Sequence, residues 1–233
     1  MMRAVLIPVK DLTRAKQRLA GLLAQEERTA LARAMFEDVF FAVAAARGVD
    51  AVFVVSSDAS ILTRVRSLGW EVFPEQQQVS ESQSVDAASR LCEERGVHAL
   101  LRLPIDIPLI EPRDIEGLLD VVSEGPSVVL VPSRDGEGTN ALLRNPPTLF
   151  SSHFGPGSLR KHRHEARRAG AHVQVIRNSR IELDIDDEAD LRAFLAAGGR
   201  ETATGACLRR LLADLRVEWT AGLETVGGLF VGE

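Results

Sequence analysis

Cysteine and long apolar runs are both scarce in this chain of 233 residues. Cys92 and Cys207 are too few for the disulfide framework of a small secreted domain. No apolar run reaches the roughly 18 residues that a membrane-spanning helix needs, and the N-terminus begins like a strand instead of a signal peptide. We therefore expect a cytoplasmic protein without a membrane partner.

An excess of positive charge is also absent. The formal net charge is −5 and the sequence pI is about 5.6, which argues against a protein that coats nucleic acid. Lysine supplies only 3 of the 28 cationic residues, yet Lys10 and Lys16 lie together just after the first apolar run. Because lysine is a compact point charge suited to phosphate oxygens, these two residues and the nearby Arg18 are candidate phosphate ligands.

Short apolar runs alternate with longer amphipathic segments, which predicts strands that alternate with helices. The predicted strands cover residues 4–9, 51–56, 71–73, 99–103, 128–131, 172–176 and 181–183. The predicted helices cover residues 26–46, 59–67, 84–95, 112–123, 158–169 and 188–197. This order predicts a Rossmann-like α/β fold, with a mostly parallel sheet and helices on both faces.

The length and the 45% hydrophobic content suit one α/β domain with a large core. Gly198-Gly199-Arg200 resembles a boundary after the last predicted helix. We therefore assign residues 1–197 to the main domain and residues 198–233 to a C-terminal appendage of uncertain order. The appendage has one amphipathic segment at about 206–215, which leaves a homodimer open.

Two acidic motifs follow apolar runs, namely Leu-Pro-Ile-Asp-Ile-Pro-Leu at 103–109 and Leu-Asp-Ile-Asp-Asp at 183–187. Their carboxylates, Asp106, Asp184 and Asp186, would emerge where strands of an open sheet give way to loops, the usual place for ligands. Carboxylate oxygens suit magnesium, which proteins usually hold together with substrate phosphates. The sequence therefore predicts a site for one or two Mg²⁺ ions.

Strand periodicity supports the pairing of Asp184 with Asp186, because residues two apart in an extended segment project to the same side. Asp187 should then point away. The alternative is that Asp186 or Asp187 caps the helix that begins near Glu188, and that Asp106 is only a turn residue between prolines.

A second candidate region is the segment Phe-Gly-Pro-Gly-Ser at 154–158. Gly155, Gly157 and Ser158 precede a predicted helix, whose first backbone N–H groups and dipole favour an anion. An ordinary turn with an N-cap is the alternative interpretation. The basic run Arg-Lys-His-Arg-His at 160–164 is typical of a solvated helix face, and His98, His153 and His172 lack metal-ligand spacing.

In order and spacing, these motifs resemble the guanylyltransferase family of coenzyme F-420 biosynthesis, a branch of the MobA-like nucleotidyltransferases. The resemblance covers most of residues 3–197. Beside the two acidic motifs, it is carried by Pro-Val-Lys at 8–10, Ala-Lys-Gln-Arg-Leu at 15–19, Gly-Thr-Asn-Ala-Leu at 138–142 and the segment at 154–158.

The resemblance implies a nucleotidyltransferase domain of the glycosyltransferase-A-like type and an enzyme of the 2.7.7 class. GTP would donate GMP to a phosphorylated three-carbon acid, with release of pyrophosphate. The candidate acceptors are 2-phospho-L-lactate, phosphoenolpyruvate and 3-phospho-D-glycerate. Because the acceptor phosphate is already ionised near neutral pH, no protein general base is expected, and catalysis depends on positioning and charge neutralisation.

The resemblance also implies roles for individual residues. Asp106, Asp184 and Asp186 would bind the metal, with Asp106 and Lys10 as the catalytic residues. The acceptor would contact Lys10, Thr139, Gly155 and Ser158. The nucleotide would contact Lys16, Arg18, Gln83 and Asp106.

One segment departs from the family pattern. Many relatives have Leu-Asn-x-Ala before the third helix, where this chain has Ser-Glu-Ser-Gln-Ser-Val-Asp at 80–86. Gln83 falls opposite the family asparagine, and its amide can still donate and accept at a base edge. The alternative is a polar loop in which Ser84 caps the helix.

Two other functions stay open. One is a catalytically silent nucleotide-binding module that engages a partner through its C-terminus. The other is a nucleotidyltransferase that acts on a molybdenum cofactor. The second is weakened because Lys-Asp-Leu-Thr-Arg at 10–14 occupies the place of the glycine-rich phosphate loop that such relatives usually have.

Overall fold

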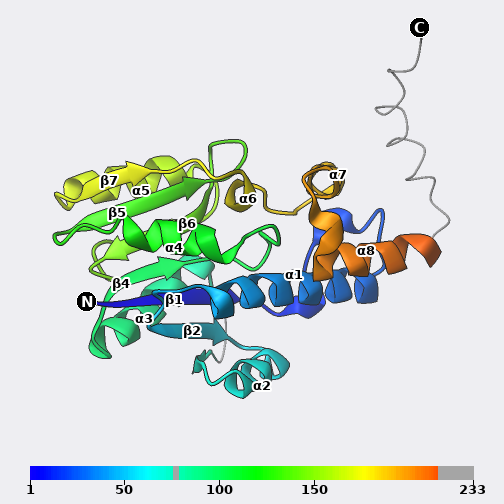
Figure 1. Ribbon diagram of the computed structural model, residues 1–233, viewed down its shortest axis with the longest axis horizontal. Helices are drawn as coiled ribbons and strands as arrows, with labels where there is room; N and C mark the ends of the chain where they lie inside the picture. The colour runs from blue at the N-terminus through cyan, green and yellow to red at the C-terminus, as the bar shows by residue number, and fades with distance from the viewer. Residues whose placement is uncertain (76–78, 215–233) are drawn as a thin grey trace, which may run out of the picture.

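The computed structural model describes residues 1–75 and 79–214 (Figure 1). Within these residues, seven strands form one sheet in the order β3-β2-β1-β4-β6-β5-β7. The strands are β1 (Met2–Val9), β2 (Ala51–Ser56), β3 (Glu71–Pro74), β4 (Val97–Arg102), β5 (Ser127–Pro132), β6 (Thr139–Asn145) and β7 (His172–Val175). All neighbouring strands are parallel except β6, which is antiparallel to β4 and to β5. The predicted α/β class with a mostly parallel sheet is confirmed.

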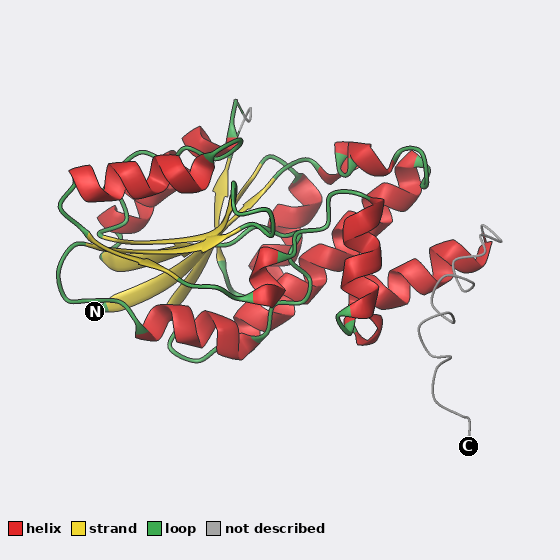
Figure 2. Cartoon of the chain, turned by 90° about the horizontal axis from the view of Figure 1, so that it is seen from above, coloured by secondary structure: helices red, strands yellow, loops and turns green. Residues whose placement is uncertain are grey.

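Helices cover both faces of the sheet (Figure 2). They are α1 (Gln25–Ala45), α2 (Ala59–Ser67), α3 (Glu81–Glu94), α4 (Pro112–Asp120), α5 (Ser158–Arg168), α6 (Ser179–Glu182), α7 (Glu188–Ala196) and α8 (Ala203–Asp214). Short 3-10 turns occur at η1 (Leu12–Arg14), η2 (Gln17–Leu19) and η3 (Gly199–Glu201). None of the helices in the described ranges has both the length and the apolar character that crossing a bilayer requires.

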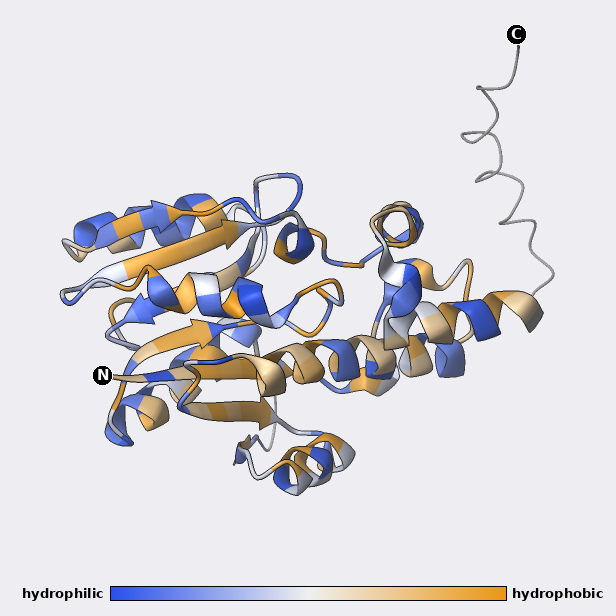
Figure 3. Cartoon of the chain, viewed as in Figure 1, coloured by the Kyte–Doolittle hydropathy of each residue, from blue (hydrophilic) through white to orange (hydrophobic). Residues whose placement is uncertain are grey.

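Strand β1 lies inside the sheet between β2 and β4 and is covered on both faces. Its alternate residues enter different cores: Val5 and Ile7 pack with residues of α1, whereas Ala4 and Leu6 pack with residues of α3. A strand that is buried on both faces has a continuous apolar sequence, and β1 can therefore be recognised from the sequence alone. Figure 3 shows the same contrast, with β2, β4 and β5 mostly hydrophobic and α5 mostly hydrophilic.

Side-chain caps set several helix starts. Asp58 accepts hydrogen bonds from the backbone N–H groups of Ser60 and Ile61 at the start of α2. Pro112 occupies the first turn of α4, where the missing N–H costs nothing. At α3 the cap is Ser80, which accepts from the Gln83 N–H, so the alternative in which Ser84 caps this helix is wrong.

The structure differs from the prediction at two places. Residues 181–183 were predicted as a strand, but Ile181 and Glu182 belong to helix α6 and Leu183 is its C-cap. Asn178 starts this helix by accepting from the N–H groups of Arg180 and Ile181. Strand β6 was not predicted, because polar residues interrupt its apolar run, although all of β6 is buried. Its Arg144 is buried between partners on other segments, which sequence periodicity does not reveal.

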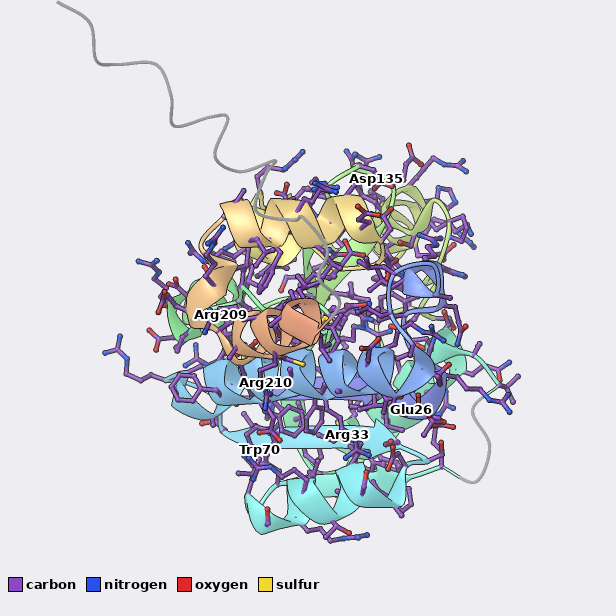
Figure 4. All side chains as sticks on the ribbon, turned by 90° about the vertical axis from the view of Figure 1, so that its right-hand side faces the viewer. Glu26, Arg33, Trp70, Asp135, Arg209 and Arg210 are labelled. Carbon is purple, nitrogen blue, oxygen red and sulfur yellow. The ribbon has the colours of Figure 1, made fainter. Side chains whose placement is uncertain are left out.

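The described part of the predicted appendage contains η3 and α8, and α8 matches the predicted amphipathic segment. Helix α8 lies along α1 (Figures 1 and 4). The Asp38 carboxylate on α1 accepts hydrogen bonds from the backbone N–H groups of Ala203 and Thr204, and Leu208 joins the main core. Residues 215–233 lie outside the described residues. The domain boundary after residue 197 and the homodimer stay predictions.

Candidate active site

A cavity of ≈ 920 Å³ opens at the carboxyl ends of β1 and β4. The strand order reverses between these two strands, since the chain builds β2 and β3 on one side of β1 and later strands on the other. Such a switch point leaves a crevice where open α/β sheets bind ligands. Seven of the predicted site residues line this cavity: Lys10, Lys16, Arg18, Asp106, Thr139, Asp184 and Asp186.

Lys16 joins two of the acidic residues. Its Nζ lies 2.8 Å from Oδ2 of Asp106 and 3.0 Å from Oδ1 of Asp186. Burial would lower the pKa of Lys16, but the charges and hydrogen bonds of both carboxylates more than offset this, so the pKa is raised. For Asp106, burial would raise the pKa, but Lys16, together with the charge of Arg102 and a backbone hydrogen bond, more than offsets this, so the pKa is lowered. Both groups therefore stay charged at neutral pH.

The backbone at Lys16 is unusual. Among the described residues it is the only non-glycine residue with a positive φ, at 53°. A left-handed conformation costs a residue with a Cβ about 1 kcal/mol or more, and such costs tend to occur at functional sites. Lys16 lies between the turns η1 and η2, and its left-handed backbone occurs together with the direction of its side chain toward Asp106 and Asp186.

The acidic segment 183–187 runs in extended form past Asp106. The Ile185 N–H donates to the Asp106 carbonyl over 2.9 Å, which holds the two acidic motifs together while Ile185 itself is buried. Asp184 and Asp186 reach the cavity, as the strand periodicity predicted. Asp187 instead caps α7, where it accepts from the Asp190 N–H over 3.1 Å.

Asp184 has no cationic partner within the described residues. Asn140 donates to its Oδ1 over 3.1 Å. Burial raises the pKa of Asp184, and the negative charges of Asp106 and Asp186 raise it further. Lys16 and Arg18, whose Nη1 lies 3.5 Å from Asp186 Oδ2, supply two positive charges against three carboxylates. The cluster therefore keeps an excess of negative charge, which an additional cation would relieve.

The donor set fits magnesium by its chemistry, because three carboxylates from two neighbouring segments supply the hard oxygen ligands that Mg²⁺ prefers. In the ranges that the structure describes, no three His, Cys, Asp or Glu side chains are arranged to hold a metal ion. Lys16 lies between two of the three predicted ligands instead. The assignment of Asp106, Asp184 and Asp186 to a metal is therefore a proposal and is taken up below.

Sequence analysis missed a second charged group in the cavity, formed by Arg102 and Glu81. Arg102 is buried at the end of β4, donates to the Asn140 carbonyl over 3.0 Å and contacts the Glu81 carboxylate. Its guanidinium lies 4.3 Å from the centre of the Phe154 ring. Lys10 Nζ lies 3.8 Å from Glu81 Oε2. The sequence signal that could have revealed this group is Arg102 itself, a charged residue at the end of the mainly apolar strand β4.

The remaining predicted site residues do not line the cavity. Gln83 is exposed in the first turn of α3. Gly155 and Gly157 have positive φ values of 106° and 67°, which shape the turn into α5. Ser158 is buried behind the cavity wall, with its Oγ 3.2 Å from Thr139 Oγ1.

The fold is that of a nucleotidyltransferase-like α/β protein. The crystal structure of a putative nucleotide-diphospho-sugar transferase from Desulfovibrio desulfuricans G20 matches with a TM-score of 0.73, covering 90% of this chain and 95% of that one at 19% identity. CMP:2-keto-3-deoxy-manno-octonic acid synthetase complexed with CTP matches with a TM-score of 0.58, covering 86% and 100% at 15% identity. At these identities the likeness shows the fold alone.

The family follows from sequence comparison. The model of the family described as "Guanylyl transferase CofC like" matches residues 2–226, and the chain belongs to this family. It is 39% identical over 193 residues to the phosphoenolpyruvate guanylyltransferase of Rubrobacter xylanophilus, covering 83% of this chain and 93% of that protein. It is 35% identical over 198 residues to the 2-phospho-L-lactate guanylyltransferase of Methanothermobacter thermautotrophicus, covering 85% and 86%. The resemblance inferred from the motifs is confirmed.

Proposed function

We propose that this protein is a magnesium-dependent guanylyltransferase of coenzyme F-420 biosynthesis. It transfers GMP from GTP to a phosphorylated three-carbon acid and releases pyrophosphate. The observation that carries the proposal is the meeting of Lys16, Asp106, Asp184 and Asp186 in a cavity at the switch point of the sheet, in a chain of a guanylyl transferase family. The names of the relatives support phosphoenolpyruvate and 2-phospho-L-lactate as acceptors, and 3-phospho-D-glycerate is the third candidate.

The central problem of this reaction is charge, because an acceptor phosphate oxygen attacks the α-phosphorus of GTP while both partners are anionic. Asp106, Asp184 and Asp186 would hold magnesium, which when bound neutralises phosphate charge and stabilises the departing pyrophosphate. Lys16 and Arg18 would place positive charge against the nucleotide phosphates. The chain then contributes mainly orientation and fixed charge.

The acceptor belongs on the side of the cavity formed by Lys10 and Thr139, with Gly155 and Ser158 behind it. Lys10 is largely exposed, and its ammonium lies 3.8 Å from Glu81, so it can turn to a phosphate at little cost. No protein base is required, because the attacking phosphate oxygen is already ionised near neutral pH.

Both alternative functions are less well supported. A non-catalytic nucleotide-binding module would not need three carboxylates and a buried lysine in one cavity. It would also not explain the unfavourable left-handed backbone conformation of Lys16. The molybdenum-cofactor reaction is disfavoured by the match to a guanylyl transferase family over residues 2–226.

The direct test is pyrophosphate release by purified protein with magnesium. GTP is offered with phosphoenolpyruvate, each 2-phospholactate enantiomer or 3-phospho-D-glycerate, and the panel is repeated with CTP, ATP and UTP. We expect turnover with GTP and at least one of these acids, and its complete loss when EDTA removes the metal. Nucleotide binding without turnover on any acid would reject the proposed reaction.

Replacing Lys16 by methionine tests the nucleotide assignment. The variant removes a cation proposed to contact phosphate, and a hydrogen bond to a charged group is worth about 1.5–3 kcal/mol. We therefore expect the KM for GTP to rise about 10- to 100-fold. Lys161→Met, which changes an exposed lysine on α5, is the matched control and should behave as wild type. An unchanged KM for GTP in Lys16→Met would contradict the assignment.

A further inference from the structure

His162 is a buried imidazole behind the acceptor side of the cavity. It lies on α5 and is 0% exposed, inside the basic run at 160–164 that was interpreted from the sequence as a solvated helix face. The rings of Phe150, His153 and Phe154 surround it, with centroid distances of 6.1, 6.3 and 5.1 Å. It is therefore held in one orientation.

The hydrogen bonds of His162 define its tautomer. The backbone N–H of His153 lies 2.8 Å from Nε2, and because a backbone N–H can only donate, Nε2 carries no hydrogen. Burial and, to a smaller extent, the charge of Arg144 lower the pKa of His162 to about 3, so the ring is neutral at neutral pH. A neutral ring without a hydrogen on Nε2 carries it on Nδ1.

That hydrogen is directed at Thr139. Nδ1 of His162 lies 3.1 Å from Thr139 Oγ1, and Ser158 Oγ donates to the same oxygen over 3.2 Å. A hydroxyl oxygen has two lone pairs, so these two donors occupy both. In the part of the chain that the structure describes, these two side chains are the only hydrogen-bond partners of the Thr139 hydroxyl. Its own hydrogen is left for a ligand in the cavity that Thr139 lines.

We propose that His162 is a positioning residue, which fixes the Thr139 hydroxyl as a hydrogen-bond donor to an anionic oxygen of the acceptor. This inference rests on the proposed function and adds a residue to the acceptor site. An ionised phosphate or carboxylate oxygen only accepts hydrogen bonds, so a hydroxyl that donates attracts it, whereas one that turns a lone pair toward it repels it. His162 removes the second orientation before the acceptor arrives.

The segment that holds His162 is itself fixed on both sides of His153. The Ser152 N–H donates to the Asp86 carboxylate over 2.9 Å, and the Phe154 N–H donates to Ser82 Oγ over 2.9 Å. Both partners lie on α3. The His153 N–H, which sets the tautomer of His162, is thus held in place by α3, whereas His162 itself lies on α5. The hydrogen bond from His162 to Thr139 therefore depends on how the segment 152–154 packs against α3.

Two substitutions separate the proposed role from a purely structural one. His162→Leu keeps an apolar side chain of moderate size but cannot donate, whereas the amide of His162→Asn supplies an N–H close to the position of Nδ1. We expect His162→Leu to raise the KM for the acceptor about 10-fold, with the KM for GTP unchanged. His162→Asn should restore most of the lost acceptor affinity. Equal effects on both KM values, or an Asn variant as impaired as the Leu variant, would overturn the proposal.

A double substitution supplies a further criterion. In a Thr139→Val background the hydroxyl is already absent, so His162→Leu should produce no additional rise in the acceptor KM. If the two effects multiply instead, then His162 does not act through Thr139 and the proposal is wrong.

The tautomer is measurable in the unmodified protein, which keeps the test valid even where a variant does not fold. Nitrogen-15 NMR of the histidine side chains should show His162 neutral with its hydrogen on Nδ1. A hydrogen on Nε2 would refute the proposal whatever the kinetics. Failure of the proposed function has a different signature, since the wild type would then turn over none of the acids while this tautomer stayed the same.

Discussion

Replacing Asp106 by asparagine is expected to reduce turnover by about 10³-fold or more. A metal ion supplies several kcal/mol of transition-state stabilisation in such reactions, and each 1.36 kcal/mol is worth a factor of ten. Asp106 contributes a carboxylate to the proposed magnesium site and is also the closest partner of Lys16, at 2.8 Å. The amide keeps the shape of the side chain but removes the charge. The measurement is the rate of pyrophosphate release over a range of magnesium concentrations.

Asp187→Asn is the matched control. Asp187 adjoins the same acidic cluster, but its side chain caps α7, and asparagine caps helices about as well as aspartate. Its turnover and its magnesium dependence should equal those of wild type. Retained activity in Asp106→Asn, or an equal loss in both variants, would remove Asp106 from the metal site.

The largest expected effect on stability comes from Arg144→Met, which should lower the free energy of unfolding by about 3–5 kcal/mol. Arg144 is 2% exposed, and its guanidinium donates to Ser89 Oγ over 2.8 Å, to the Phe150 carbonyl and to Asp86. Methionine fills much of the same space but leaves these buried acceptors without their donor. Urea unfolding measures the effect as a lower midpoint with an unchanged slope.

Arg47→Met provides the comparison, because Arg47 also pairs with a carboxylate, that of Glu116, but on the surface. Solvent screens such pairs, so no measurable shift of the urea midpoint is expected. Similar shifts in the two variants would show that the buried network of Arg144 is no more important to stability than an exposed ion pair.

Sequence reasoning succeeded where a local pattern determines the structure. The apolar run of β1 was recognised, and the acidic motifs correctly brought Asp106, Asp184 and Asp186 together, since all three line one cavity. Only Asp106 follows a strand, however, because Asp184 and Asp186 follow helix α6. Sequence reasoning failed at β6, because Arg144 is a charged residue in a fully buried strand and its partners lie 6 to 58 positions away in the chain. It failed at 181–183 because two or three apolar residues suit a short helix as well as a strand.

The site residues that were missed share one cause. Arg102 meets Glu81 across 21 positions, and His162 meets Thr139 across 23, so neither pair forms a local motif. His162 was further concealed because its neighbours in the sequence are basic and partly or fully exposed, although it is itself completely buried. Only the fold shows that one histidine of a charged helix points inward.

The reversed direction of β6 has a consequence for how this enzyme class can diversify. Because β6 runs against β4, its first residue, Thr139, lies at the same edge of the sheet as the last residues of β1 and β4. Of the proposed acceptor ligands, Thr139 therefore belongs to the β5–β6 hairpin, while the acidic residue Asp106 follows the parallel strand β4. An insertion in the turn at 133–138 would act on the cavity through Thr139, the first residue after the turn, and would leave Asp106 in place. A change of acceptor by this route would spare the carboxylates proposed to bind the metal.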